Sequence, residues 1–409
     1  MQLGQEYELA NSEPVVRGAE GVHRGATEGL ALPAKLEEWS PLWKGLARIG
    51  GALPSADIAD TDPWDLLRPD ERPSARRGPD GRLIRAANTD TNTDRPTGAY
   101  AYPRFDAPVP PGGYSWWYMD ALSDDGRHGL TLIAFLGSVF SPYYKRSGRG
   151  NPLDHAALNV ALYGPSARWT MTERPQQAVR PEASQLAIGP SAIRWVGDCL
   201  VIDIEERDKR IMAPWQRRVA GQVRIWPEML NTAPFALDPA GRHVWHCIAP
   251  RARIEVEMRE PALSWKGSAY LDSNRGSESL EEGFRVWHWS RAHLGRDVAV
   301  LYEGRRRDNS SFASALRFDA TGVPHEAELP PVAPLRDTLW QLERRTRADR
   351  GIASVIRTWE DVPFYTRSTV SARLYGEQVV AMQETLSMDR FCSPVVQLML
   401  PFRMPRAAG

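Results

Sequence analysis

The chain has 409 residues and a formal net charge of zero, because 51 basic side chains balance 51 acidic ones. A protein that follows nucleic-acid phosphates needs a net basic surface, so this balance argues against nucleic acid as a partner. The length suggests two or three domains, and 42% hydrophobic with 25% charged residues is typical of a soluble globular protein. Tryptophan is unusually frequent, with 15 copies, and wide indole faces suit an apolar or cationic ligand as well as a core.

The cysteines and the apolar runs do not indicate a secreted or membrane-spanning protein. Cys199, Cys247 and Cys392 are too few and too far apart for a disulfide framework or a CxxC metal knuckle. The longest apolar run, residues 130–140, is shorter than the ~18 residues that a membrane helix requires. The N-terminus has early acidic residues and no apolar segment, unlike a secretory signal. We therefore expect a cytoplasmic protein with reduced thiols.

Residues 1–113 differ from the rest of the chain in composition. They contain 13 Pro and 13 Gly, about 23% of the segment, which is close to the level typical of disordered chains. A short helix is predicted over 36–46, and the polar run 88–94 is typical of a loop. We expect an N-terminal arm, partly irregular, that folds against the main body.

From Tyr114 onward the sequence predicts antiparallel hairpins. Polar and apolar residues alternate along short segments that are separated by tight turns, without the long amphipathic crossovers of a parallel sheet. The predicted strand pairs are 115–122 with 130–135, 192–196 with 199–204, 253–258 with 263–272, and 370–375 with 378–386, with further strands at 284–290, 298–302 and 314–318.

This pattern predicts an all-β, mainly antiparallel fold with two barrel-like units. Hairpins at this spacing form barrels or sandwiches, and a barrel of about eight strands leaves room for one ligand. We place the arm at 1–113, the first barrel at 114–250 and the second at 251–409.

The familiar catalytic and cofactor motifs are missing from the sequence. It has no GxGxxG after a strand, no GxxxxGK[ST], no HExxH and no GxSxG. His243 and His246 lie three positions apart on a predicted strand, so their side chains point to opposite faces and cannot share one ion without a bulge. We expect neither a metal nor an organic cofactor.

The densest group of chemically useful residues falls on two predicted strands. Alternation places His243 with Trp245 on one face, and Tyr270 with Asp272 on one face. Inside a barrel, burial would raise the pKa of the Asp272 carboxyl and make it a general acid. His243 can relay protons near neutral pH, and the two aromatic rings can stabilise a cation. The alternative is that Asp272 only begins a turn that runs to Gly276.

Several long stretches resemble one known family. They are Tyr114–Leu130, Ser138–Tyr144 and Leu158–Gly164, followed by His243–His246 and Tyr270–Gly276. These stretches are similar to the carotenoid 1,2-hydratases of phototrophic bacteria, also called hydroxyneurosporene synthases. The similarity continues to about residue 402, so it covers most of the chain after the arm, and it is far more specific than a short motif.

The resemblance implies a cofactor-independent hydro-lyase of carotenoid biosynthesis. Such an enzyme adds water to the terminal C-1,2 double bond of an acyclic carotene, such as neurosporene or lycopene, and makes a tertiary alcohol at C-1. The family fold is a pair of lipocalin-like β-barrels. Its important residues correspond to His243, Trp245, Tyr270 and Asp272 of this sequence, and all four match.

Applied to this chain, the resemblance implies a mechanism through a tertiary cation. Asp272 protonates C-2, the rings of Trp245 and Tyr270 face the cation at C-1, and water adds there. His243 or the Asp272 carboxylate then removes the extra proton. Asp120 is an alternative acid, and His288 is an alternative base.

The resemblance also raises the question of how an insoluble C40 polyene reaches the protein. We expect peripheral contact with the photosynthetic membrane or with other carotenoid enzymes, through an exposed apolar edge. The aromatic and basic segment 140–146 is one candidate, although it can equally be a loop packed on its own barrel. The alternative function is a non-catalytic lipocalin-like carrier, which an Asp272 in a solvent-exposed turn would favour.

Overall fold

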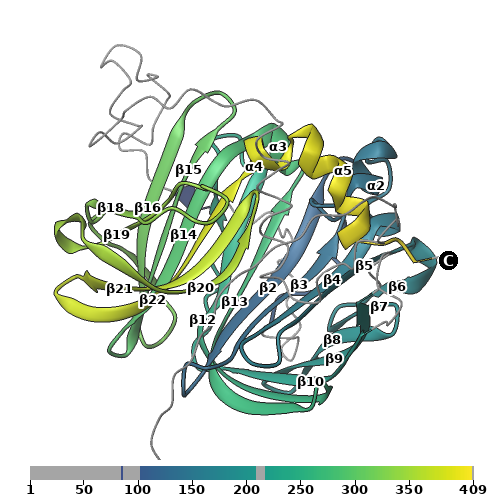
Figure 1. Cartoon of the computed structure of the whole chain (residues 1–409), viewed down its shortest axis with the longest axis horizontal. Helices are drawn as coiled ribbons and strands as arrows, with labels where there is room; N and C mark the ends of the chain where they lie inside the picture. The colour runs from purple at the N-terminus through teal and green to yellow at the C-terminus, as the bar shows by residue number, and fades with distance from the viewer. Residues whose placement is uncertain (1–83, 86–101, 209–216, 408–409) are drawn as a thin grey trace, which may run out of the picture. The chain divides into compact units, whose positions relative to one another are not determined.

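Antiparallel β-strands make up most of the described chain. The computed structural model describes residues 84–85, 102–208 and 217–407, and all of them belong to one compact unit, residues 53–409. The helix predicted over 36–46 and the loop predicted over 88–94 lie outside the described residues. The all-β, mainly antiparallel fold class is confirmed, and the strands form two large sheets and one small one (Figure 1).

The larger sheet, sheet A, has the strand order β5-β4-β3-β2-β13-β12-β10-β9-β8-β7-β6, with β11 on β12 and β1 on β11. Its strands are β1 Ile84–Arg85, β2 Tyr114–Ser123, β3 Gly129–Leu136, β4 Ala156–Tyr163, β5 Arg168–Arg174, β6 Val179–Pro181, β7 Gln185–Ile188, β8 Ser191–Val196, β9 Cys199–Asp208, β10 Arg217–Pro227, β11 Phe235–Ala236, β12 His243–Glu260 and β13 Leu263–Gly276. Because β5 also contacts β9, the sheet curls back on itself into a nearly closed barrel.

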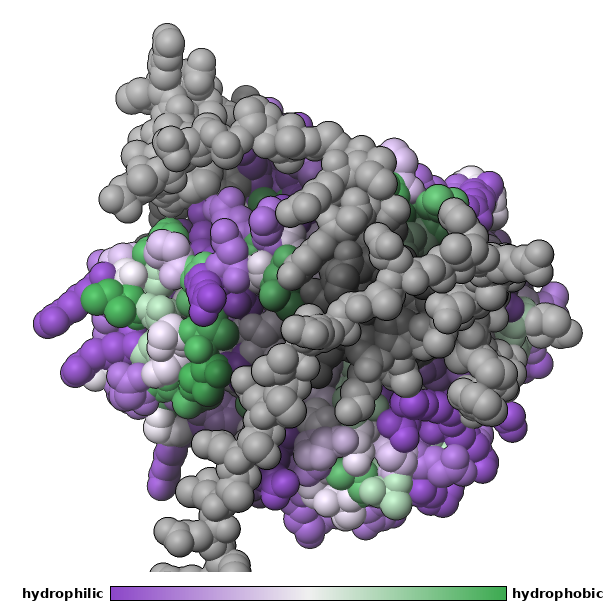
Figure 2. All heavy atoms as spheres, in the orientation of Figure 1, coloured by the Kyte–Doolittle hydropathy of each residue, from purple (hydrophilic) through white to green (hydrophobic). Residues whose placement is uncertain are grey.

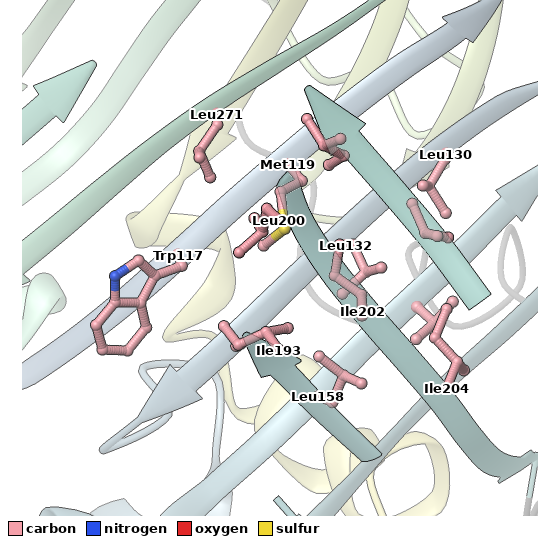
Figure 3. Close-up of a cluster of buried hydrophobic side chains, with 14 of the residues drawn as sticks. Trp117, Met119, Leu130, Leu132, Leu158, Ile193, Leu200, Ile202, Ile204 and Leu271 are labelled. Atoms are coloured by element: carbon pink, nitrogen blue, oxygen red, sulfur yellow. The ribbon is translucent and has the colours of Figure 1, made fainter. Parts of the chain in front are cut away.

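One side of sheet A surrounds a hydrophobic core of its own. Trp117 and Met119 from β2 point into it, as do Leu271 from β13 and Leu200 and Ile202 from β9 (Figure 3). These side chains are buried, and they occupy alternate positions along their strands, as the pleat requires. The barrel interior is therefore filled by the protein's own side chains.

The second large sheet, sheet B, has the order β17-β16-β15-β14-β22-β21-β20, and the hairpin β18–β19 packs against β14, β20 and β22. The strands are β14 Phe284–Leu294, β15 Asp297–Arg306, β16 Ser311–Phe318, β17 Pro324–Glu326, β18 Val332–Leu335, β19 Arg344–Arg347, β20 Ala353–Val362, β21 Tyr365–Leu374 and β22 Glu377–Ser387. A second core lies between sheet B and this hairpin. It contains a cavity of about 10 Å³, which holds about one water molecule.

Short helices connect and cover the sheets. They are α2 Pro142–Arg146, α3 Leu280–Gly283, α4 Met388–Phe391 and α5 Pro394–Arg403, with 3-10 turns η2 Pro152–His155, η3 Gln176–Ala178 and η4 Asp349–Gly351. Helix α5 begins with Ser393, whose hydroxyl accepts a hydrogen bond from the Val396 amide, and with Pro394 at its first position. Val396 and Leu400 bury one face of this helix against the sheets.

The predicted hairpins are all present, but the predicted boundary between two units does not coincide with the change of sheet. The pairs β2–β3, β8–β9, β12–β13 and β21–β22 contain the strands expected from the sequence. Residue 250, however, lies inside β12, which runs from His243 to Glu260 as part of sheet A. The chain passes to sheet B between Gly276 and Phe284.

A third hydrophobic cluster lies between sheets A and B. It is built from the faces of β2, β12 and β13 that point away from the first core, and from β14, β15 and β22 of sheet B, and α4 and α5 pack on it. Trp116, Trp245, Trp287 and Trp289 belong to it and are buried. Among the described residues, buried tryptophans therefore lie in this cluster as well as in the first core, which contains Trp117, Trp195 and Trp265.

Candidate active site between the two sheets

The pairing of β12 with β13 brings three of the four predicted site residues together. Cys247 lies opposite Asp272 in this antiparallel pair, and Trp245 lies opposite Asn274. The Trp245 indole Nε1 donates a hydrogen bond of 2.9 Å to Asp272 Oδ2. The Tyr270 hydroxyl donates another of 2.9 Å to the same oxygen. One carboxylate oxygen is therefore held by two donors from neighbouring strands.

Asp272 is buried, and its surroundings favour the protonated form of its carboxyl. Its residue is 5% exposed, and burial raises the pKa of its carboxyl to about 8, although the hydrogen bonds from Trp245 and Tyr270 act in the opposite direction. The nearby acidic groups Glu384 and Asp120 raise this pKa further. Asp272 lies within β13, which continues to Gly276, so it does not begin a solvent-exposed turn.

The two carboxyl oxygens of Asp272 have different surroundings. Asp272 Oδ1 is buried and has no hydrogen-bond partner among the described residues, whereas Oδ2 accepts two hydrogen bonds. A carboxylic acid places its hydrogen on one oxygen and accepts on the other. When Asp272 is protonated, this arrangement favours a hydrogen on Oδ1.

Aromatic rings from both sheets surround this acid. Trp245 meets Tyr302 edge-on with ring centroids 5.5 Å apart, and Tyr270 lies 5.1 Å from Trp289. Tyr302 and Trp289 face each other across the β14–β15 pair. Asp272 therefore lies between the two sheets, not inside a barrel as the sequence led us to expect.

His243 shares the face of Trp245 but belongs to a separate cluster of contacts. Its Nδ1 is 2.9 Å from the Tyr114 hydroxyl, and its Nε2 is 3.1 Å from Glu278 Oε1. A Cβ at position 283 would lie 2.3 Å from Nε2, so Gly283 gives the ring its space. Burial lowers the pKa of His243, although the hydrogen bond to Glu278 opposes this effect. Within the described residues, no hydrogen bond joins His243 to Asp272.

The two alternative residues have other surroundings. Asp120 is fully buried, and burial favours its neutral form, but the guanidinium groups of Arg291 and Arg367 reverse this effect and lower its pKa. His288 lies on the opposite face of β14 from Trp289 and contacts Thr385 Oγ1 at 2.9 Å. Burial lowers the pKa of His288 well below its usual value. Asp120 is thus an ionised partner of arginines, and His288 points away from Asp272.

A buried ionic network next to the site was not anticipated from the sequence. Arg291 donates to Asp120 Oδ1 at 2.5 and 2.8 Å, and Arg367 donates to Asp120 Oδ2 at 2.7 Å and also to Glu384. The Tyr118 hydroxyl donates to Glu384 at 2.5 Å. The Arg291 guanidinium also lies 5.6 Å from the centre of the Tyr270 ring. The sequence indicates only that Tyr118 and Asp120 share one face of a strand. The arginines of the network lie far from both residues in the sequence.

The aromatic and basic segment 140–146 folds onto the protein. It forms α2, in which Tyr144 is buried and donates a hydrogen bond of 2.8 Å to the Gly113 carbonyl, while Lys145 and Arg146 are exposed. Among the described residues, no helix is long and apolar enough to cross a membrane. The same residues include no group of three His, Cys, Asp or Glu side chains that could hold a metal ion.

Comparisons with known proteins point to one family. The family profile described as "Carotenoid hydratase CrtC" matches residues 132–409. An acyclic carotenoid 1,2-hydratase of Thiocapsa roseopersicina is 49% identical over 375 residues, which is 90% of each chain. The protein of the same name from Rubrivivax gelatinosus is 48% identical over 75% of this chain and 76% of its own. That from Cereibacter sphaeroides is 37% identical over 68% of this chain and 99% of its own.

Proposed function

Because the chain belongs to the carotenoid hydratase family, we propose that it adds water to the C-1,2 double bond of an acyclic carotenoid. Neurosporene and lycopene are the substrates that we propose. The observation that carries the proposal is the buried Asp272, whose pKa burial raises, whose Oδ1 has no partner among the described residues, and whose Oδ2 accepts hydrogen bonds from Trp245 and Tyr270. This is the group that hydration of an alkene needs first.

The first step is proton transfer to carbon. An isolated alkene is a weak base, so the acid must lie next to the carbon that it protonates, and it must not lose its proton to solvent. The proton moves from Asp272 Oδ1 to C-2, the π electrons form the new C–H bond, and a tertiary cation remains at C-1. The faces of Trp245 and Tyr270 stabilise this cation, as does the negative charge left on Asp272. The two hydrogen bonds to Oδ2 stabilise the carboxylate that forms.

Water completes the reaction at C-1. Its oxygen forms the C–O bond, and one of its protons passes to the Asp272 carboxylate, which restores the acid. Asp272 is better placed for this step than His243, because the cation forms beside Asp272. His243 lies four positions away in the β12–β13 register, about 13 Å along the strands. The overall reaction is redox-neutral, so the proton exchange at Asp272 accounts for it without an organic cofactor.

His243 supports the site from a distance in this proposal. It connects β12 to β2 through Tyr114 and to the residues before α3 through Glu278. Tyr114 in turn stacks on Trp116, which lies against Trp287 of sheet B. His243 is thus a positioning residue that holds one end of the aromatic cluster.

The carotenoid reaches the site from a membrane surface, and helix α5 is the proposed contact. Val395, Leu398 and Phe402 are 41%, 69% and 48% exposed, and their spacing places them on one face of the helix. Its opposite face packs on the aromatic cluster that contains Trp245 and Tyr270. On the face viewed in Figure 2, hydrophobic residues reach the surface in small groups between hydrophilic ones.

The charges near α5 favour an anionic surface. Arg403, which lies over the Trp169 ring, is in the last turn of the helix. Helix α2, which contacts α5, ends with the exposed Arg146 and with Lys145, which lies 3.5 Å from Glu281. Each basic residue near an anionic membrane contributes about 1 kcal/mol of attraction. Apolar side chains beside basic ones are typical of helices that lie in the membrane interface.

Purified protein with detergent-dispersed lycopene or neurosporene tests the reaction. We expect a product heavier by one water, and Asp272→Asn lowers its rate by about 10²- to 10⁴-fold because the proton donor is lost. Asp124→Asn is the control, since this aspartate is exposed and pairs with Arg253 at the β2–β3 turn. Binding without any mass change by the wild type would instead indicate a carrier.

A further inference from the structure

One oxygen of Asp272 and two buried polar groups near it lack a hydrogen-bond partner among the described residues. They are the Asp272 Oδ1, the Asn274 side-chain amide Nδ2 and the Trp289 indole Nε1. Asn274 is 4% exposed and Trp289 is 5% exposed. Buried polar groups are almost always paired, and where the protein supplies no partner, a bound water that makes about three hydrogen bonds commonly does.

These groups face one region of the molecule. Asn274 follows Asp272 by two positions on β13, so both side chains point to the same face, toward sheet B. Asn274 lies opposite Trp245, whose indole holds Asp272. On the other sheet, Trp289 pairs with Tyr302, and Trp289 also contacts Tyr270 at 5.1 Å.

Tyr302 provides an independent link between the two sheets at this point. Burial raises the pKa of its hydroxyl well above the usual value, the charge of Asp272 adds to this effect, and a hydrogen-bonding interaction with the Asn274 side chain, too long or misaligned to count as a hydrogen bond by geometry, opposes it. Tyr302 is therefore near both β13 residues while standing beside Trp289. The Asn274 and Trp289 side chains therefore both lie beside residues that contact Asp272.

We infer that the Asn274 amide and the Trp289 indole hold the water that attacks C-1, beside the free oxygen of Asp272. This inference rests on the proposed hydratase function and adds a water-binding site to the proposed proton donor. The bound water accepts hydrogen bonds from Asn274 Nδ2 and Trp289 Nε1. One of the two lone pairs of the water oxygen gives up its hydrogen bond and forms the C–O bond with C-1. A proton of the water then passes to the Asp272 carboxylate.

The inference separates two steps that depend on different residues. Asp272 makes the cation, whereas Asn274 supplies the water that captures it. A cation that is not captured loses a proton, from C-2 or from a methyl group on C-1, to the Asp272 carboxylate and becomes an alkene again. In D2O the acid carries deuterium, so this return leaves deuterium in recovered alkene or in its double-bond isomer.

The experiment measures alcohol and deuterated alkene together, in D2O with detergent-dispersed lycopene. We expect Asn274→Leu, which has a similar size and no donor, to lower the ratio of alcohol to deuterated alkene at least 10-fold. Asp272→Asn is expected to lose both products. Asn159→Leu, on β4 of sheet A, is the matched control and keeps the wild-type ratio.

Two further variants keep the test decisive. If Asn274→Leu does not fold, Asn274→Ala gives the same ratio measurement, and Asn274→Ser, which retains a donor, is expected to recover part of it. An unchanged ratio in Asn274→Ala or Asn274→Leu would overturn the water site while leaving the hydratase intact. If the wild type forms neither product, the proposed function itself fails.

Discussion

At the scale of single residues, Asp272 is costly to the fold for the same reason that it is useful. Its carboxyl is buried with a pKa of about 8, whereas an unfolded chain has a carboxyl of pKa near 3.9. Between these values the folded protein binds one proton more than the unfolded chain, so the free energy of unfolding decreases as the pH rises. Below about pH 4 both states are protonated, and the dependence disappears.

This cost predicts that removing the acid stabilises the protein at neutral pH. Relative to wild type, Asp272→Asn should gain about 1.4 kcal/mol of unfolding free energy for each pH unit between about pH 5 and 7. The amide oxygen can still accept from Trp245 and Tyr270. Denaturant unfolding of both proteins at pH 5, 6 and 7 measures the difference. A constant difference across this range, like that expected for the exposed Asp124→Asn, would mean that Asp272 is ionised in the folded protein.

The residues of the site were predictable only where one strand pair carries them. Alternation places Tyr270 with Asp272. Two irregularities in β12, between Cys247 and Ala252, shift the β12–β13 register, so the hairpin turn alone does not predict that Trp245 reaches the same carboxyl. His243 also lies on the predicted face, but its distance from Asp272 depends on the register along the whole hairpin. Asp120 shows a different limit: its charge state depends on Arg291 and Arg367, which lie far away in the chain.

At the scale of elements, the ionic network fastens β2 of sheet A to three strands of sheet B. Asp120 comes from β2, Arg291 from β14, Arg367 from β21 and Glu384 from β22. Arg367 is 1% exposed and bridges both acids. Removing one partner of a buried pair leaves an uncompensated charge, which costs far more than the pair itself contributes.

Arg367→Met should therefore lower the free energy of unfolding by about 3–5 kcal/mol. Methionine keeps most of the apolar length of the arginine side chain, so the loss of stability reflects Asp120 and Glu384, which lose a cationic partner. Arg373→Met is the matched control, because Arg373 is exposed on the same strand β21, and it should change stability by less than about 0.5 kcal/mol. Equal effects of the two changes, measured by denaturant unfolding, would exclude the network as a link between the sheets.

Elements that are close in sequence were predicted well, and their long-range partners were not. Each hairpin follows from alternation and a turn, both of which are local. The pairings of β2 with β13 and of β14 with β22 join strands far apart in the chain, and nothing in their own residues specifies the partner. For that reason a boundary at residue 250 looked natural, although β12 and β13 complete the first sheet.

At the scale of the whole described unit, the site is a product of two sheets meeting. Sheet A supplies the acid and its two hydrogen-bond donors, and sheet B supplies Trp289 and Tyr302. The barrel of sheet A and the space between sheet B and the β18–β19 hairpin each have a separate hydrophobic core, so the proposed reaction region can be aromatic and dry without emptying either one. The helix α5 closes against this same cluster, which joins the reaction region to the surface proposed to meet a membrane.

That arrangement predicts a specific membrane contact. Leu398→Glu combined with Phe402→Glu should weaken binding to vesicles containing phosphatidylglycerol at least 10-fold, because burying each apolar side chain contributes about 1.5–3 kcal/mol and the new charges repel the lipid. Flotation of wild type and variant with anionic and with phosphatidylcholine vesicles measures it. Ile352→Glu is the control, since Ile352 is equally exposed, at 69%, and precedes β20 of sheet B.

The lipid dependence decides between a membrane and another partner for α5. Wild-type binding should be stronger on anionic vesicles and should fall with added salt, because Lys145, Arg146 and Arg403 act through screened charge. Turnover of lycopene held in the vesicles should decrease in the α5 variant in parallel with binding. If the variant and Ile352→Glu bind vesicles equally and turn over vesicle lycopene at the same rate, α5 is not the membrane contact, and the carotenoid must reach Asp272 by another side of the aromatic cluster.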